Sequence, residues 1–142
     1  MACPGCQASG KPVEILTIKA LLTASALQRF EPADYRFCAV PDCDLVYFAQ
    51  GGPAFRAGDI QVRVWQKEPR GHRMLCYCFA ENETDMTAEI KRTGQSSAAD
   101  RIRRHIEARR CACEVRNPKG SCCLGDVLAA TERLRARVAD GS

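Results

Sequence analysis

The spacing of apolar residues divides the chain into a first part with the two-residue period of β-strands and a later part with helical signals. Val13–Ile18 begins with alternating apolar residues, and Ile60–Trp65 alternates cleanly. Between them, two aromatic segments, Tyr35–Phe37 and Leu45–Phe48, flank a cysteine-containing turn. Alternation over about four to eight residues predicts strands with one buried face. We therefore expect the first part of the chain to be a small β-rich domain.

Helical signals begin after Glu68–Gly71, where Pro and Gly indicate a linker. Three later segments have helical spacing or capping residues: Thr84 to Gly94, Ser96 or Ser97 to Arg110, and about Gly125 to Ala139. In the first part, Thr23 or Ser25 is suited to cap a short helical turn. We therefore predict an α+β protein, with a β-rich domain over residues 1–68 and a three-helix domain over residues 72–142.

Cysteine is the unusual feature of the composition, because it occupies ten of 142 positions. Met1–Cys6 has neither the basic nor the apolar region of a secretory signal peptide, and no apolar run approaches the ~18 residues of a membrane span. We therefore expect a cytoplasmic protein without membrane insertion. In that compartment, closely spaced cysteines indicate metal ligands rather than disulfides.

The first four cysteines have the C-x2-C and C-x4-C spacing of a treble-clef or ribbon-like zinc site. They are Cys3, Cys6, Cys38 and Cys43. Four thiolates leave zinc no open coordination position, so the expected role is structural. Iron in a rubredoxin-like site and free or disulfide-paired cysteines are the alternatives.

The hexapeptide Met1–Cys6 also matches M-x-C-x-x-C, the copper-binding loop of heavy-metal-associated domains. That loop normally lies between a first strand and a helix. Here a predicted strand follows the hexapeptide, which favours zinc over copper at these two cysteines.

A second cysteine set is concentrated near the end of the chain. Cys111–Cys123 contains four cysteines, no apolar stripe, and turn signals at Asn117–Pro118 and Lys119–Gly120. Because such a segment has no hydrophobic reason to adopt one shape, we expect a bound metal to impose it. Cys76–Cys78, a C-x-C motif, is the predicted first part of this centre.

These motifs resemble two related families. Cys76-Tyr77-Cys78, a threonine-initiated helix and cysteines before the last helix resemble the bacterioferritin-associated-ferredoxin (BFD-like) type of [2Fe–2S] domain. Across nearly the whole chain, four features resemble the N-terminal metal domain of CopZ-type copper chaperones. They are the C-x-x-C start, the hairpin Phe-Cys-x4-Cys-Asp-x-Val-Tyr-Phe, the Cys-Tyr-Cys motif, and Cys-x3-Asn-Pro-x-Gly-x-Cys-Cys.

The resemblance implies a zinc ion in the first half and a [2Fe–2S] cluster in the second. The implied cluster ligands are Cys76, Cys78, Cys113 and Cys123, with Cys122 as the fallback for the fourth. The position before Asn-Pro favours Cys113 over Cys111, which is then expected to be unligated. Cys123 is preferred to Cys122 because it lies closest to the apolar start of the last helix.

The formal net charge of +4 counts every thiol as neutral. A zinc ion with four thiolates and an oxidised two-iron cluster with four thiolates each carry about −2, which brings the sum to about zero. We therefore interpret Arg101–Arg110 as a solvated helix face, with an electrostatic docking surface and nucleic-acid binding as alternatives. His72 and His105 are isolated and are interpreted as surface residues. No nucleophile–base pair, phosphate loop or paired carboxylates stand out, which favours a non-enzymatic role.

We therefore hypothesise a metal-handling redox protein with a [2Fe–2S] cluster, a structural Zn2+ and Cu+ as a candidate cargo. By resemblance, the cluster supplies an electron, for instance to reduce Cu(II) to Cu(I). By resemblance, a C-terminal heavy-metal-associated domain would deliver the copper, and the sequence up to Ser142 does not contain its motif after residue 6. We therefore expect a partner protein: a copper chaperone, a metal-transporting ATPase or a redox partner. The alternatives are a soft-metal binding or sensing module that uses Cys111 and Cys122, and a general ferredoxin-type electron carrier.

Overall fold

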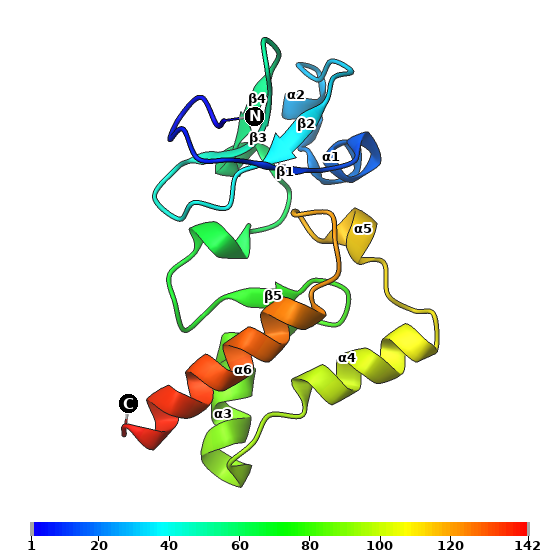
Figure 1. Cartoon of the computed structure of the whole chain (residues 1–142). Coiled ribbons are helices and arrows are strands. Elements are labelled where there is room, and N and C mark those ends of the chain that lie inside the picture. Colours follow the sequence, from blue (N-terminus) through cyan, green and yellow to red (C-terminus); the bar gives the residue numbers. More distant parts are fainter. Residues whose placement is uncertain (1, 142) are drawn as a thin grey trace. The chain divides into compact units, whose positions relative to one another are not determined.

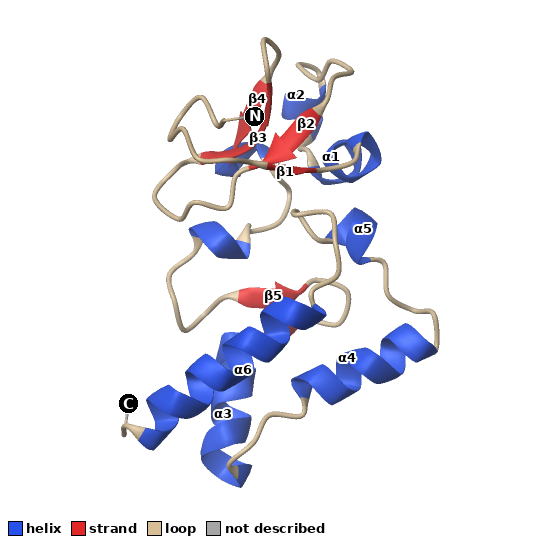
Figure 2. Cartoon of the chain, in the orientation of Figure 1, coloured by secondary structure: helices blue, strands red, loops and turns tan. Residues whose placement is uncertain are grey.

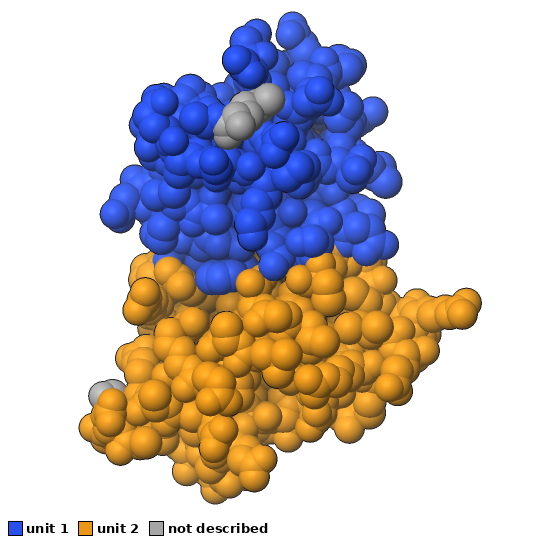
Figure 3. All heavy atoms as spheres, viewed as in Figure 1, with its two compact units in different colours: residues 1–68, 114–121 blue, residues 69–113, 122–142 orange. Residues whose placement is uncertain are grey.

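The computed structural model describes residues 2–141 (Figure 1). The chain forms two compact units (Figure 3). Unit 1 comprises residues 1–68 and 114–121, and unit 2 comprises residues 69–113 and 122–142. Met1, which begins the copper-loop match and the first predicted domain, and Ser142, which ends the second, lie outside the described residues. No sequence signal linked residues 114–121 to unit 1.

Unit 1 is built on a four-stranded antiparallel sheet with the order β1-β2-β3-β4 (Figure 2). The strands are β1 (Lys11–Pro12), β2 (Tyr35–Phe37), β3 (Leu45–Ala49) and β4 (Ala54–Arg56). The hairpin of β2 and β3 matches the two predicted aromatic strands, and it pairs Phe37 with Tyr47. The two aromatic segments on either side of the cysteine turn therefore do form strands, as predicted.

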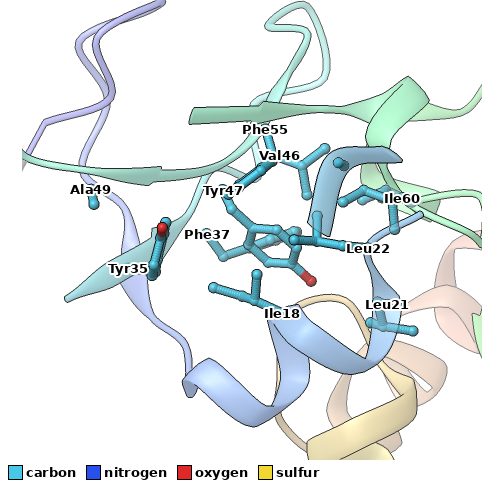
Figure 4. Packing of buried hydrophobic residues seen from close by; sticks show 12 residues of the cluster. Ile18, Leu21, Leu22, Tyr35, Phe37, Val46, Tyr47, Ala49, Phe55 and Ile60 are labelled. Atoms are coloured by element: carbon cyan, nitrogen blue, oxygen red, sulfur yellow. The ribbon is translucent and has the colours of Figure 1, made fainter. Parts of the chain in front are cut away.

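Every residue of β3 is buried, because this strand contributes to two apolar clusters. Val46, Tyr47 and Ala49 belong to the large core, where they pack with residues of the two short helices α1 and α2 (Figure 4). Leu45 and Phe48 belong to a smaller cluster together with three of the predicted zinc-site cysteines. The central strand therefore joins the hydrophobic core of unit 1 to its cysteine set.

The strand predicted over Val13–Ile18 is wrong, because this part of the chain forms the helix α1 (Ile15–Leu21). The buried residues Ile18, Leu21 and Leu22 recur at the three- and four-residue spacing of a helix face, whereas Leu16 is 65% exposed. In so short a segment the apolar positions fit both periods, and packing against the sheet selects the helix.

A second short helix, α2 (Ala24–Leu27), follows in unit 1. The Thr23 side chain accepts a hydrogen bond from the backbone N–H of Ala26 at 3.2 Å. The predicted helical turn and its cap at Thr23, one of the two candidates, are therefore confirmed.

The strand predicted over Ile60–Trp65 is also wrong. Only Ile60 forms a β-bridge, with Leu22, and two short 3-10 helices flank the segment, η1 (Ala57–Asp59) and η2 (Trp65–Lys67). The alternating apolar residues do reflect burial, since Ile60 and Val64 are buried. The backbone, however, is not paired as a strand: the N–H of Gln61 donates to the carbonyl of Leu21. Its hydrogen bonds thus go to the end of α1 rather than to a neighbouring strand.

Unit 2 combines a small hairpin with helices. The hairpin strands are β5 (Met74–Cys76) and β6 (Glu81–Asn82), and the long helices are α3 (Glu83–Thr93), α4 (Ala98–Glu107) and α6 (Leu124–Ala139). The short helix α5 spans Cys113–Arg116. The segments α3, α4 and α6 correspond to the three for which the sequence predicted helices.

The ends and buried faces of these helices follow local chemistry. The side chain of Asn82, rather than Thr84, caps α3 by accepting from the N–H of Asp85 at 2.9 Å. At the other end Gly94 adopts φ +84°, the left-handed conformation that glycine tolerates best. In α6 the buried face includes Val127 and Leu134, while Leu128 is 40% exposed.

Glu83 ties the linker region to the helices of unit 2. Its side chain is fully buried and accepts hydrogen bonds from the backbone N–H groups of Gly71 and Arg73 at 3.0 and 2.9 Å. The Arg133 guanidinium donates to the other carboxylate oxygen at 2.5 Å. A buried carboxylate is tolerated because its oxygens are satisfied by these donors.

Candidate metal centres

The structure brings the four cysteines of the first set together in unit 1. All four Sγ atoms lie within 4.8 Å of one another, with Cys3 to Cys43 at 3.8 Å and Cys6 to Cys38 at 3.7 Å. Four sulfurs at ~2.3 Å from a tetrahedral zinc are ~3.8 Å apart. The sulfur positions therefore fit zinc without rearrangement of the backbone.

Two tight turns position these sulfurs. The first turn, or knuckle, contains Cys3 and Cys6. The backbone N–H of Cys3 donates to the carbonyl of Ala8, and the carbonyl of Cys3 accepts from the N–H of Gln7, both at 2.8 Å, so the chain reverses direction here. A Cβ on Gly5 would lie 3.1 Å from Cys43 Sγ, so glycine permits the close approach of the two knuckles. The second knuckle is the turn between β2 and β3.

Burial and hydrogen bonding set the acidity of the thiols in this set. Burial raises the pKa of the Cys38 thiol to about 12, although the nearby Lys67 ammonium acts in the opposite direction. At Cys3 burial is outweighed by the backbone N–H groups of Cys6 and Gly5, so its pKa is lowered. Because zinc binds thiolates, metal binding must displace the remaining protons.

Lys67 is a functional candidate that the sequence analysis missed. Its ammonium lies 3.6 Å from Cys38 Sγ and donates to the carbonyl of Val40 at 2.5 Å. A zinc ion with four thiolates carries a charge of about −2, which a cation in contact with one sulfur partly offsets. No sequence signal indicated this role, since Lys67 lies far along the chain from the cysteines it accompanies.

Replacing Lys67 by methionine is expected to increase the rate of zinc loss to a colorimetric chelator by about tenfold. This is the lower end of the change typically caused by mutating a residue that contacts a metal ligand. The side-chain length is kept while the charge is removed. Lys11→Met, at an exposed position in β1, is the matched control and is expected to release zinc at the wild-type rate. Equal rates for both variants would show that Lys67 does not stabilise the site.

Five of the six remaining cysteines converge in unit 2. Cys76 ends β5 and Cys123 immediately precedes α6, and both are fully buried. Cys113 begins α5 and is 2% exposed, whereas Cys78 and Cys111 are half-buried. Cys122 is exposed. The adjacent cysteines before the last helix therefore differ sharply in accessibility.

The sulfur-to-sulfur distances define a connected group. Cys113 Sγ lies 3.7 Å from Cys123 Sγ, 4.0 Å from Cys78 Sγ and 3.3 Å from Cys111 Sγ. Cys76 completes the group through a hydrogen bond with Cys123. The structure thus brings together Cys76, Cys78, Cys113 and Cys123, the four preferred cluster ligands, and adds Cys111 to them.

Hydrogen bonds between the sulfurs lower the pKa of two of these thiols, whereas burial raises the pKa of Cys78 and Cys111. The hydrogen bond with Cys123 lowers the pKa of Cys113 to about 5 and that of Cys76 to about 7. The same hydrogen bonds, with Cys113 and Cys76, raise the pKa of Cys123. Thiolates are the ligands of zinc and of iron–sulfur clusters, so this donor set suits a soft metal centre.

Two further features of unit 2 suit an anionic centre. The backbone N–H of Ala112 donates to Cys78 Sγ at 3.2 Å, and hydrogen bonds of this kind raise the potential of a cluster. Helix α6 begins directly after Cys123, so the partial positive charge of its N-terminus lies next to that sulfur. The residues present therefore fit a two-iron cluster held by four cysteines.

Arg101 and the two histidines of unit 2 contact other residues of that unit. Arg101 of α4 forms ion pairs with Glu81 at 2.7 Å and with Glu89 at 3.2 Å. The His105 ring stacks on Phe79 with 3.8 Å between centroids, and His72 Nδ1 lies 3.2 Å from the Thr84 hydroxyl. Among residues 2–141, neither histidine belongs to a group of potential metal ligands.

Comparison with known proteins supports the resemblance. Residues 1–61 match a CopZ-type family described as a zinc-binding domain. The copper chaperone CopZ of Archaeoglobus fulgidus is 30% identical over 123 residues, which cover 87% of this chain and 58% of the chaperone. The chain thus spans less than two thirds of that relative.

The crystal structure of the N-terminal domain of Archaeoglobus fulgidus CopZ superposes with a TM-score of 0.74 at 27% identity, covering 91% of this chain and 96% of that domain. The mixed α+β fold and the similarity to the CopZ N-terminal domain, both expected from the sequence, are therefore confirmed. A helix long and apolar enough to cross a membrane does not occur within residues 2–141.

Proposed function

We propose that this chain is a metal-handling redox protein, in which unit 1 holds a structural zinc and unit 2 holds a [2Fe–2S] cluster. The observation that carries the proposal is the convergence of four buried or half-buried cysteines in unit 2. They are Cys76, Cys78, Cys113 and Cys123. Zinc alone needs only the four cysteines of unit 1, so the second set indicates a second centre.

A two-iron cluster supplies one-electron transfer, and one electron converts Cu(II) to Cu(I). The role of the protein is to hold the four sulfurs, to limit access of water to Cys76, Cys113 and Cys123, and to tune the potential through the Ala112 N–H. The similarity to a protein named copper chaperone supports copper, or another soft metal, as the species handled.

Reduction of Cu(II) tests this function. Protein reduced with one equivalent of dithionite electrons and mixed anaerobically with Cu(II) is expected to yield about one Cu(I) per chain, detected with a Cu(I)-specific chelator, as the cluster returns to its oxidised spectrum. A reduced cluster that persists in the presence of Cu(II) would exclude this role and leave a general electron carrier as the alternative.

Cys111 favours a second candidate function, the binding or sensing of a soft metal. The sulfurs of Cys78, Cys111 and Cys113 lie within 4.8 Å of one another, and a group of three thiolates suits Cu(I). In cluster-free protein, Cys111→Ser is expected to weaken Cu(I) binding, whereas the same change in cluster-loaded protein is expected to leave the visible spectrum intact. Unchanged Cu(I) affinity would exclude this candidate.

The proposed setting is the cytoplasm, where a protein partner completes the pathway of the metal. A metal-transporting ATPase, a copper chaperone or a redox partner would each match the chemistry, because each exchanges either a soft metal ion or an electron. Crosslinking of metal-loaded protein to a candidate of each class, with the cluster-free protein as control, distinguishes them.

A further inference from the structure

The segment between two proposed cluster ligands belongs to the zinc-containing unit. Residues 114–121 are part of unit 1, whereas Cys113 and the Cys122–Cys123 pair, which lie at its two ends, are part of unit 2 (Figure 3). Each end of the segment is connected to a ligand by no more than two peptide bonds. Any constraint on the segment therefore acts directly on the backbone of both ligands.

Two buried hydroxyl groups of unit 1 hold this segment. The Tyr47 hydroxyl donates to the carbonyl of Pro118 at 2.5 Å, and the Thr17 hydroxyl donates to the carbonyl of Glu114. Both side chains are fully buried. Figure 4 shows the Tyr47 ring packed with Ile18 and other residues of the core, so its hydroxyl is fixed by the surrounding side chains.

The segment is also rigid in itself. Asn117 is fully buried, and its side-chain amide donates to the carbonyl of Ser121 at 2.9 Å. Its side-chain oxygen accepts from the backbone N–H of Lys119, and its backbone carbonyl accepts from the N–H of Gly120. Gly120 adopts φ +76°, and a Cβ there would lie 2.9 Å from a methyl group of Val13. Only glycine fits this position, which explains the turn signal in the sequence.

We propose that Tyr47 and Thr17 are positioning residues for the cluster: through the carbonyls of Pro118 and Glu114 they fix the segment that sets the spacing and orientation of Cys113 and Cys123. This inference rests on the proposed function, because it presumes a cluster at these cysteines. Metal ligands act best when their supporting residues are fixed in turn. Unit 1 therefore contributes to cluster retention, in addition to binding zinc.

Removing either hydroxyl tests the proposal. In Tyr47→Phe and Thr17→Val the shape of the core is nearly kept, while one buried carbonyl loses its donor. We expect the visible absorption of the cluster to decay about tenfold faster in the presence of an iron chelator, a factor that corresponds to about 1.4 kcal/mol. The reduction potential is also expected to shift, because a ligand that moves changes the hydrogen bonds to its sulfur.

Tyr35→Phe is the matched control. Tyr35 is a buried tyrosine of the same sheet, and its hydroxyl donates to the carbonyl of Glu31 at 2.6 Å, away from the segment. The Tyr35→Phe substitution removes the same kind of hydrogen bond from unit 1. It is expected to leave the rate of cluster decay and the reduction potential at wild-type values. Cluster decay in Tyr47→Phe and Thr17→Val at the rate of Tyr35→Phe would overturn the proposal.

Hydrogen exchange in zinc-loaded protein without a cluster separates this inference from the proposed function. Amides of residues 114–121 are expected to exchange about tenfold faster in Tyr47→Phe than in Tyr35→Phe. Equal exchange would overturn the anchoring itself. Faster exchange in a protein whose wild type binds no iron would instead refute the cluster while the anchoring of the segment stands.

Discussion

Replacing Cys123 by serine is expected to abolish iron binding, whereas replacing its neighbour Cys122 by serine is expected to leave the cluster intact. Cys123 is fully buried, and its sulfur lies 3.7 Å from that of Cys113. Cys122 is exposed. A serine oxygen is a harder ligand than a cysteine sulfur, and the serine hydroxyl is less acidic than a thiol. Serine therefore cannot replace a cysteine ligand without weakening the centre.

Iron content and visible absorption of the two purified variants measure this difference. We expect less than about a tenth of the wild-type iron in Cys123→Ser, and wild-type iron in Cys122→Ser. The two variants differ by one position along the chain and remove the same atom, so differences in expression or oxidation affect both. Loss of iron from Cys122→Ser alone would reassign the fourth ligand to Cys122.

Replacing Cys38 by serine is expected to unfold unit 1. The free energy of zinc binding at structural sites is about 10–16 kcal/mol, comparable to or larger than the total stability of a small domain, about 5–15 kcal/mol. Cys38 is 1% exposed and follows β2 directly, so the loss of zinc leaves buried thiols next to the central strand β3. Among residues 2–141 no disulfide compensates for this loss, since none of the ten cysteines is disulfide-bonded.

Near-ultraviolet circular dichroism of the tyrosines in unit 1 measures this change. Tyr35 and Tyr47 are both buried there, and the signal that arises from their fixed environment is expected to disappear in Cys38→Ser or after zinc chelation. Cys122→Ser serves as the control for loss of a single thiol. A Cys38→Ser protein that keeps this signal and unfolds at the wild-type denaturant concentration would contradict a structural role for zinc.

The parts of the fold that could be predicted from the sequence have local causes. The aromatic strands around the second knuckle, the cap at Thr23 and the end of α3 at Gly94 each depend on residues within a few positions. The spacing of the first four cysteines likewise indicated that their sulfurs would meet, because two tight turns can share one ion.

The parts that could not be predicted depend on contacts between distant residues. The apolar residues of Val13–Ile18 fit a strand or a helix, and burial of Leu21 and Leu22 in the core favours α1. The hydrogen bond from Tyr47 to Pro118 joins residues 71 positions apart. The contact of Lys67 with Cys38 spans 29 positions. No periodicity or motif contains such information.

Cys111 illustrates the limit for the site. The family resemblance implied that Cys111 is unligated, yet its sulfur lies 3.3 Å from that of Cys113. The chain turns back through Ala112, whose N–H donates to Cys78, and this hydrogen bond places Cys111 beside the proposed ligands. Sequence spacing alone cannot distinguish a ligand from a thiol that is held next to one.

Metal analysis combined with a visible spectrum tests the central claim most directly. The protein purified in air is expected to be reddish-brown and to contain about two irons and about one zinc per chain. A colourless protein that contains zinc but no iron would contradict the assignment of a [2Fe–2S] cluster to Cys76, Cys78, Cys113 and Cys123.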